Sequence, residues 1–251
     1  MFITLLSFAR RARAIALLGG LGALAATIIP LSGFAAAPNN LCATKDYQCV
    51  IKYGDTAIAD RQSDLTILSG RVALQYHAGR ITSSDNDTLT SDISANQSGL
   101  NSLKAKLDGD TDAATARADY KSIFTTYRIY AVVLPRDYNE LLQDVVVYAD
   151  GRLQSEEPTI QDAINGAPAS VQQQANQLFS DYKTQVTNSQ AQVSAAQQII
   201  PQLTVSAYNA DPTGYRTTYD SYKTDTHTAS LDARTAINDL HQILQLLKSA
   251  K

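Results

Sequence analysis

Apolar positions along most of this chain recur at alternating intervals of three and four residues. The longest unbroken series covers residues 215 to 247. It comprises Tyr215, Tyr219, Tyr222, Thr226, Ala229, Ala233, Ala236, Leu240, Ile243 and Leu247. This spacing is typical of the buried face of an α-helix, and ten positions in register are typical of a coiled-coil helix. The pattern therefore predicts a long C-terminal helix with one apolar seam.

Three further seams follow the same rule. They comprise Leu89, Ile93, Asn96, Leu100, Leu103 and Leu107; then Ala116, Tyr120, Ile123, Tyr127, Tyr130 and Leu134; then Val171, Ala175, Leu178, Tyr182, Val186, Ser189, Val193, Ala196 and Ile200. In the last series two steps of four follow one another at Leu178, Tyr182 and Val186, which predicts a local stutter. No stretch alternates convincingly as a strand.

Polar clusters and prolines divide the chain between these seams. They predict helices near residues 50–81, 86–107, 111–134, 136–153, 168–200 and 213–249. Pro135 either kinks one helix or separates two. We therefore expect an all-α fold, an elongated antiparallel bundle of about five or six helices in coiled-coil-like hairpins. Hairpins would occupy residues 51–153, a loop 154–167, and a long C-terminal hairpin 168–251.

The N-terminus has the pattern of an export signal. Arg10, Arg11 and Arg13 precede a run from Ala14 to Thr44 that contains no charged residue. We expect residues 1–35 to be a signal peptide cut after Ala35, which predicts a secreted or extracytoplasmic protein. The alternative is an anchor by an uncleaved N-terminal helix, because about 20 apolar residues can span a bilayer.

The two cysteines of the chain, Cys42 and Cys49, follow this signal directly. In an exported protein they predict one disulfide that ties down the N-terminal segment 36–50. Free thiols and a lipid-anchored cysteine are the alternatives. The residues before Cys42 are not the small ones that a lipoprotein signal needs.

Charge and residue types exclude several function classes. Without its three signal arginines the chain has 18 Lys and Arg against 24 Asp and Glu, a net charge of about −6, which argues against nucleic-acid binding. No Ser-His-Asp order, zinc-protease motif or phosphate-binding glycine loop is present. After removal of the signal we expect no membrane span. We predict that the protein is not an enzyme and carries no cofactor.

Asp108, Asp110 and Asp112 alternate along a turn, as in part of a calcium-binding loop. A calcium loop needs glycine at its sixth position, where this chain has Ala113. An aspartate-rich helix cap explains the same residues, because carboxylates accept hydrogen bonds from the free amides at a helix N-terminus. We expect the cap and predict no metal site.

Tyr127, Arg128, Tyr130 and Tyr138 are the candidate partner-binding residues. Tyrosine with arginine is common at binding surfaces. Tyrosine also fills the seams of amphipathic helices, with its hydroxyl at the wet edge. Both interpretations remain open from the residues alone.

The segment from Arg117 to Pro135, RADYKSIFTTYRIYAVVLP, follows an aspartate-rich turn. With its flanks, residues 103–153, it resembles uncharacterised secreted, coiled-coil-rich helical proteins of actinobacteria and of Saccharibacteria-like candidate-phylum bacteria. The resemblance implies an exported bacterial helical protein. It implies no activity, cofactor or catalytic residue.

Taken together, these patterns predict an exported, non-enzymatic protein. It would act by protein–protein contact or as a structural spacer, in the bacterial cell envelope or outside the cell. Its partner is unknown, and it could form homo-oligomers. The alternatives are a module that binds a small ligand, a metal or a glycan, and a regulator of a cell-wall enzyme.

Overall fold

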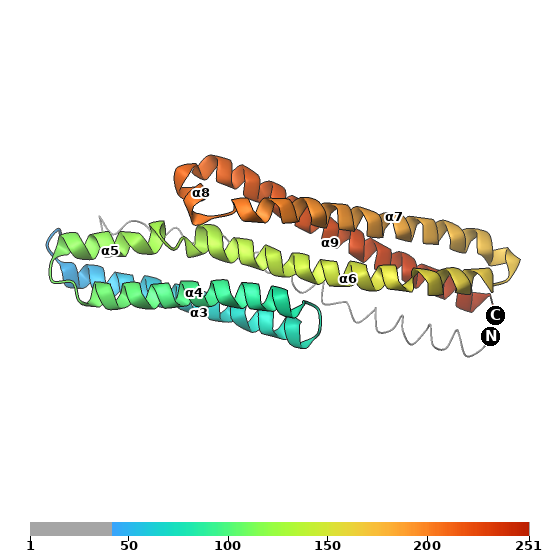
Figure 1. Ribbon diagram of the computed structural model, residues 1–251, viewed down its shortest axis with the longest axis horizontal. Helices are drawn as coiled ribbons and strands as arrows, with labels where there is room; N and C mark the ends of the chain where they lie inside the picture. Colours follow the sequence, from blue (N-terminus) through green and yellow to red (C-terminus); the bar gives the residue numbers. More distant parts are fainter. Residues whose placement is uncertain (1–41, 251) are drawn as a thin grey trace. The chain divides into compact units, whose positions relative to one another are not determined.

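The protein is all-α throughout the part that the computed structural model describes, residues 42–250 (Figure 1). Helices of all types cover 89% of these residues, and no strand occurs among them. The all-α bundle predicted from the apolar spacing is confirmed. The predicted signal peptide 1–35 and its cleavage site lie outside the described residues.

The helices follow one another with short connections. They are α3 (Tyr47–His77), α4 (Ser83–Asp108), α5 (Ala113–Thr125), the π-helix η3 (Ile129–Val133), α6 (Leu134–Asn165), α7 (Ala169–Ile199), the 3₁₀-helix η4 (Ile200–Gln202), α8 (Val205–Ala210) and α9 (Pro212–Ser249). At 1.5 Å per residue, the 38 residues of α9 extend about 57 Å.

The described residues form two compact units. The N-terminal unit contains residues 42–141 and 200–219, and the C-terminal unit contains residues 142–199 and 220–250. The chain crosses from one unit to the other inside α6, at residue 142, and again inside α9, at residue 220.

In the N-terminal unit, α3 packs against α4 and α5, α4 also packs against α5, and α8 packs on η3 (Figure 1). The seam predicted for α4 is buried at each of its leucines and at Ile93, while Asn96 is half-buried. A capping box starts α4: the Thr82 hydroxyl accepts from the Asp85 amide, and the Asp85 carboxylate accepts from the Thr82 amide. The turn before α4 contains Gly79 at a φ of 65°, a conformation that glycine adopts without strain.

The C-terminal unit is built from the second part of α6, from α7, and from the larger part of α9. Hydrogen bonds join these helices. The Tyr182 hydroxyl on α7, for example, donates to the Leu153 carbonyl on α6 at a distance of 2.5 Å. On α9 every predicted seam position from Tyr222 to Leu247 is buried. Alanines at three of them leave room for a close neighbour. Fully burying a large apolar side chain contributes about 1.5–3 kcal/mol, so this seam is a main source of the unit's stability.

The predicted loop at 154–167 is wrong, because α6 continues through Pro158 to Asn165. Leu153, Ile160 and Ile164 are fully buried on one face of this segment, whereas Pro158 is exposed. A proline inside a helix costs about 3 kcal/mol, which the burial of two isoleucines offsets. The loop is reduced to the residues between Asn165 and Ala169.

The stutter predicted in α7 is also wrong. Phe179 is buried and Leu178 only half-buried, so the buried positions run regularly through Ala175, Phe179, Tyr182 and Val186. Pro135 neither kinks a helix nor separates two. It is the second residue of α6, and the break between α5 and η3 comes earlier, at residues 126–128.

Candidate functional site

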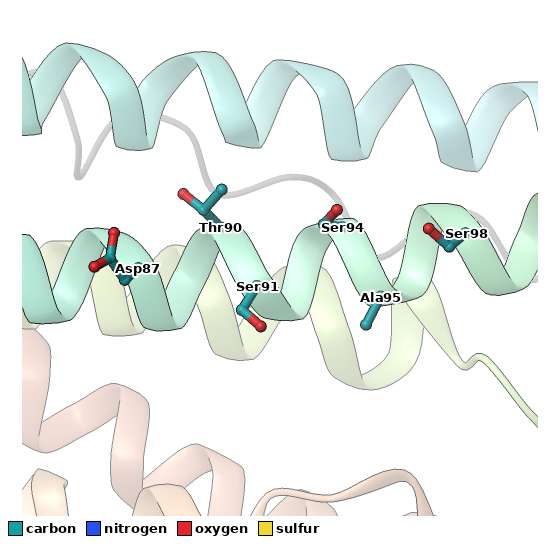
Figure 2. Close-up of a pocket in the computed structure, with 6 residues that line it drawn as sticks. All are labelled: Asp87, Thr90, Ser91, Ser94, Ala95 and Ser98. Carbon is teal, nitrogen blue, oxygen red and sulfur yellow. The ribbon is translucent and has the colours of Figure 1, made fainter.

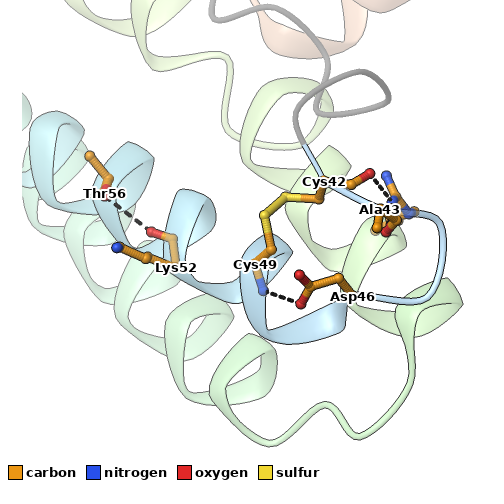
Figure 3. The surroundings of a disulfide bond; sticks show 7 residues. Cys42, Ala43, Asp46, Cys49, Lys52 and Thr56 are labelled. Carbon is orange, nitrogen blue, oxygen red and sulfur yellow. Dashed lines mark hydrogen bonds between the residues drawn. A yellow bond between two sulfur atoms is a disulfide. The ribbon is translucent and has the colours of Figure 1, made fainter.

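The N-terminal end of the described chain is held by the predicted disulfide. Cys42 and Cys49 are bonded, with their Cα atoms 5.8 Å apart (Figure 3). The Asp46 carboxylate inside the loop accepts from the Cys49 amide at 2.9 Å and so caps α3. From α5, the Arg117 guanidinium donates to the carbonyls of Cys42 and Ala43 at 3.3 and 3.1 Å. The pairing is confirmed, and it fixes the start of the fold against α5.

Tyr127 and Arg128, two of the candidate partner-binding residues, lie in the joint between α5 and η3. The Tyr127 hydroxyl donates to the Gly99 carbonyl of α4 at 2.7 Å. A Cβ atom at position 99 would collide with the Tyr127 ring, so a larger residue there would have to displace that ring. Arg128 adopts a left-handed conformation, φ 47° and ψ 36°, which is uncommon for a residue with a side chain.

Helix α8 holds this joint in place. The Arg128 Nε donates to the Asn209 Oδ1 at 2.9 Å, and its guanidinium lies 4.7 Å from the centre of the Tyr208 ring. The Asn209 Nδ2 in turn donates to the Thr125 carbonyl, the last residue of α5, at 2.7 Å. The backbone strain at Arg128, of order 1–3 kcal/mol, is therefore supported by contacts from a distant part of the sequence.

Tyr130 and Tyr138 are likewise engaged within the N-terminal unit. The Tyr130 hydroxyl donates to the Asp64 carboxylate of α3 at 2.8 Å, and burial together with this bond raises the pKa of Tyr130 to about 12. Its ring lies 4.5 Å from the buried Arg61 guanidinium. The Tyr138 ring lies 5.2 Å from the Arg71 guanidinium.

The structure does not gather the four candidate residues into one open surface. Each is half-buried, and each has a partner on another helix of its own chain. These contacts favour the packing interpretation, and a role in partner binding stays a prediction. Sequence reasoning missed Arg61, which lies between the rings of Phe124 and Tyr130 and has 4% of its surface exposed.

A buried ionic cluster surrounds the start of α6. The Arg136 guanidinium donates to the Asp92 carboxylate of α4, to Asp137 at 2.7 Å and to the Leu203 carbonyl at 3.4 Å. Glu140 faces the same cation. Three carboxylates thus share one guanidinium, and Asp137 has 1% of its surface exposed. Burial raises the pKa of Asp137 to about 8, despite Arg136, and it also raises the pKa of Glu140.

A second polar group lies in the core of the C-terminal unit. Asp150 of α6 is 2% exposed, and its Oδ2 accepts from the fully buried Ser189 hydroxyl of α7 at 2.7 Å. The same hydroxyl oxygen is 3.0 Å from the Ala229 carbonyl of α9. Burial raises the pKa of Asp150 to about 7. One signal was in the sequence: Ser189 is a polar residue at a predicted seam position.

The aspartate-rich turn serves as a helix cap. The Asp112 carboxylate accepts from the amides of Ala114 and Thr115, at 2.9 and 3.0 Å, and these bonds lower its pKa. Asp108 pairs with Lys104 at 2.9 Å. Burial raises the pKa of Asp110, and the negative charge of Asp119 raises it further. Within residues 42–250, no three His, Cys, Asp or Glu side chains converge as metal ligands.

An open hollow follows one face of α4 (Figure 2). It is lined by Asp87, Thr90, Ser91, Ser94, Ala95 and Ser98, all of them exposed. Small-molecule sites are usually concave and largely apolar, with a few buried polar groups that converge on the ligand. Because every residue that lines this hollow is exposed, it offers no buried polar group to a ligand.

Comparisons of the chain with protein-family models, curated proteins and solved structures found no match. Among the described helices, none combines the length and the apolar character that crossing a membrane requires.

Proposed function

We propose that this protein is an exported, non-enzymatic structural spacer of the bacterial cell envelope or of the space outside the cell. Its helices would hold other components apart, and its side chains would perform no chemistry. The disulfide supports the compartment, because such bonds persist mainly in oxidising surroundings.

One observation carries the proposal: the charged side chains best suited to binding or catalysis lie between helices of the protein itself. Arg61 and Arg136 are surrounded by aromatic rings or carboxylates of their own unit, and Asp150 lies in a helical core. A ligand module or an enzyme would be expected to converge such groups on a cavity. Here they join one helix to the next, which is what a rigid spacer needs.

A second function, contact with another protein, is favoured by exposed apolar residues on α3. Ile67 and Leu74 have 49% and 67% of their surfaces exposed, and they are two helical turns apart on one face. We call these two residues the α3 patch. Exposed apolar patches commonly mark sites of protein association.

Mass spectrometry of the protein secreted by its own cells tests the proposal. A spacer should give, under native conditions, a polypeptide that starts near Ala36, is two hydrogens lighter than the reduced chain, and carries no bound small molecule. A stoichiometric additional mass that is lost on denaturation would contradict the spacer and favour the ligand module. A polypeptide that retains residues 1–35 would contradict cleavage of the signal.

Photo-crosslinking distinguishes the spacer from a contact protein. A photoreactive amino acid would replace Leu74 in the α3 patch, with the equally large exposed Leu231 of α9, 45% exposed, as the matched control. A partner that docks on α3 should give a crosslinked product at position 74 and none at position 231. Crosslinks at neither position would favour the spacer.

A further inference from the structure

The buried polar layer of the C-terminal unit brings together groups from three helices. Asp150 comes from α6, Ser189 from α7, and the Ala229 carbonyl from α9. All three residues are at most 2% exposed. Small residues in the surrounding seam, such as the buried Ala233 of α9, let these helices approach closely. We call this group the Asp150 layer.

The hydrogens in the Asp150 layer can be counted. The Ser189 oxygen lies 2.7 Å from the Asp150 Oδ2 and 3.0 Å from the Ala229 carbonyl, and both distances are those of hydrogen bonds. A serine hydroxyl has one hydrogen to donate. If Asp150 is ionised, one of the two contacts therefore joins two acceptors. If Asp150 is protonated, its hydroxyl donates to Ser189, and Ser189 donates to Ala229, so both contacts are hydrogen bonds.

The charges around the Asp150 layer also favour the protonated acid. Asp232 faces it from α9 and repels a negative charge, and Tyr182 of α7 also lies within electrostatic range. The other oxygen of Asp150, Oδ1, is buried and has no hydrogen-bond partner. An ionised carboxylate in this position would lose its hydration without gaining a cation. The pKa of Asp150 is accordingly raised, mainly by burial, to about 7.

We propose that the Asp150 layer is a proton-dependent clasp that holds α6, α7 and α9 together in acid and loosens as the surroundings approach neutral pH. When Asp150 loses its proton to solvent, the Ser189 hydrogen turns to the new carboxylate and the Ser189–Ala229 bond is lost. The inference goes beyond the proposed spacer function, since it concerns the conditions under which this unit is rigid.

The direction of the effect follows from linkage. Asp150 titrates higher in the folded than in the unfolded chain, so the folded state binds more protons between these two pKa values. The contribution of the clasp to stability is complete below the unfolded pKa, near 4, and is lost as the pH rises through about 7.

The test compares the wild-type chain with Asp150→Asn over pH 4–8. Asparagine keeps a donor for Ser189 but cannot ionise. Asp162→Asn is the matched control, because Asp162 is an exposed residue of the same helix and its replacement removes the same charge. Urea unfolding followed by far-ultraviolet circular dichroism gives the unfolding equilibrium constant of each chain at each pH.

We expect the ratio of the wild-type to the Asp150→Asn unfolding constant to rise with pH, by up to about a thousandfold between pH 4 and pH 8. The Asp162→Asn chain should follow the wild type. Parallel pH profiles of the wild type and Asp150→Asn would overturn the clasp.

Hydrogen exchange keeps the test decisive if Asp150→Asn does not fold. In the wild type, amides of α7 between residues 179 and 196 should lose protection from pH 5 to pH 8, after correction for the intrinsic rate. Amides of α3 between residues 57 and 72 serve as the internal reference. Equal changes in both helices, or none in α7, would contradict the proposal.

Discussion

The two units of this protein stabilise the same kind of helical packing with opposite chemistry. The N-terminal unit has 12 Lys or Arg and 14 Asp or Glu among its described residues, and the ion pairs of Lys104, Lys106 and Arg136 lie there. The C-terminal unit has five Lys or Arg and ten Asp or Glu, a net charge of −5. Its core carboxylate contacts a serine hydroxyl instead of a cation.

This difference teaches that a buried acid in a helical core can be accommodated in two ways. In the N-terminal unit, the Arg136 guanidinium lies among Asp92, Asp137 and Glu140. In the C-terminal unit, Asp150 has no cation beside it, and in the proposed clasp it is accommodated by keeping its proton. Burial raises the pKa of Asp137 as well, so the first way combines a positive side chain with protonation, whereas the second depends on protonation alone.

Removing the cation of the N-terminal unit should have the largest effect. Arg136→Met leaves the half-exposed Asp92, the buried Asp137 and Glu140 without a positive partner, and loss of one member of a buried ion pair costs about 3–5 kcal/mol. Urea unfolding at pH 7 measures this loss, and Arg216→Met, at an exposed position of α9, is the control.

The cost of Arg136→Met should grow further in alkali. The folded-state pKa of Asp137 is raised to about 8, so its proton stabilises the fold below that value and is lost as the pH rises through it. Without Arg136 the new carboxylate has no cation beside it, so the cost of the substitution should be larger at pH 9 than at pH 7. A cost that is the same at pH 7 and pH 9 would mean that the cluster does not depend on charge.

Loss of the disulfide should weaken the N-terminal unit alone. Replacing Cys42 and Cys49 together by serine opens a short loop and should cost roughly 2–3 kcal/mol in the chain-entropy estimate. Reductant added to the wild type should reproduce the shift in Tm. Hydrogen exchange should show lower protection in α3 and unchanged protection in α7. An equal loss in both helices would show that the two units do not respond separately.

Overpacking the C-terminal unit should cost somewhat less. Ala233 is fully buried in the α9 seam, and Ala233→Leu inserts a larger side chain at about 1–3 kcal/mol. Ser249→Leu, at the exposed end of α9, should leave Tm nearly unchanged. Because α9 contacts α7 of the same chain, neither Tm should vary over a hundredfold range of protein concentration. A Tm that rises with protein concentration would mean that this seam packs against a second chain instead.

The smallest effect concerns the aspartate-rich turn. Asp112→Ala removes the cap of α5 and should cost about 1 kcal/mol, whereas Asp87→Ala on the exposed face of α4 should cost almost nothing. Calcium chloride should not change the Tm of the wild type. A calcium-dependent rise in Tm that Asp112→Ala abolishes would restore the metal interpretation.

The spacing predicted the buried seams correctly where only one apolar or small residue was available for each seam position. The ten positions from Tyr215 to Leu247 are buried, apart from the half-buried Tyr219, because α9 packs along its whole seam. Asp112 as a helix cap and the pairing of Cys42 with Cys49 were also predicted, since both depend on local spacing.

The errors arose where tertiary burial overrides a local signal. Pro158 is a helix breaker by propensity, but burial of Ile160 and Ile164 carries α6 past it. In α7, adjacent Leu178 and Phe179 both fit an apolar seam, and packing rather than spacing selects the phenylalanine.

The two polar clusters could not be derived from the sequence, because their members are far apart along the chain. Asp150 and Ser189 are separated by 39 residues, and Arg136 and Asp92 by 44. Neither the apolar spacing nor a local motif indicates which partners Arg136 and Asp137 would have.

The chain passes between the units three times, after residues 141, 199 and 219. Neither unit is therefore a contiguous stretch of sequence, and two of these passages occur in the middle of a helix, in α6 and α9. A gene segment that encodes either half cannot be exchanged between proteins by a single recombination event. The N-terminal unit is also complete only when residues 200–219 are present, and these follow residues 142–199 of the other unit along the chain. The two units are therefore inherited together, as parts of one continuous chain.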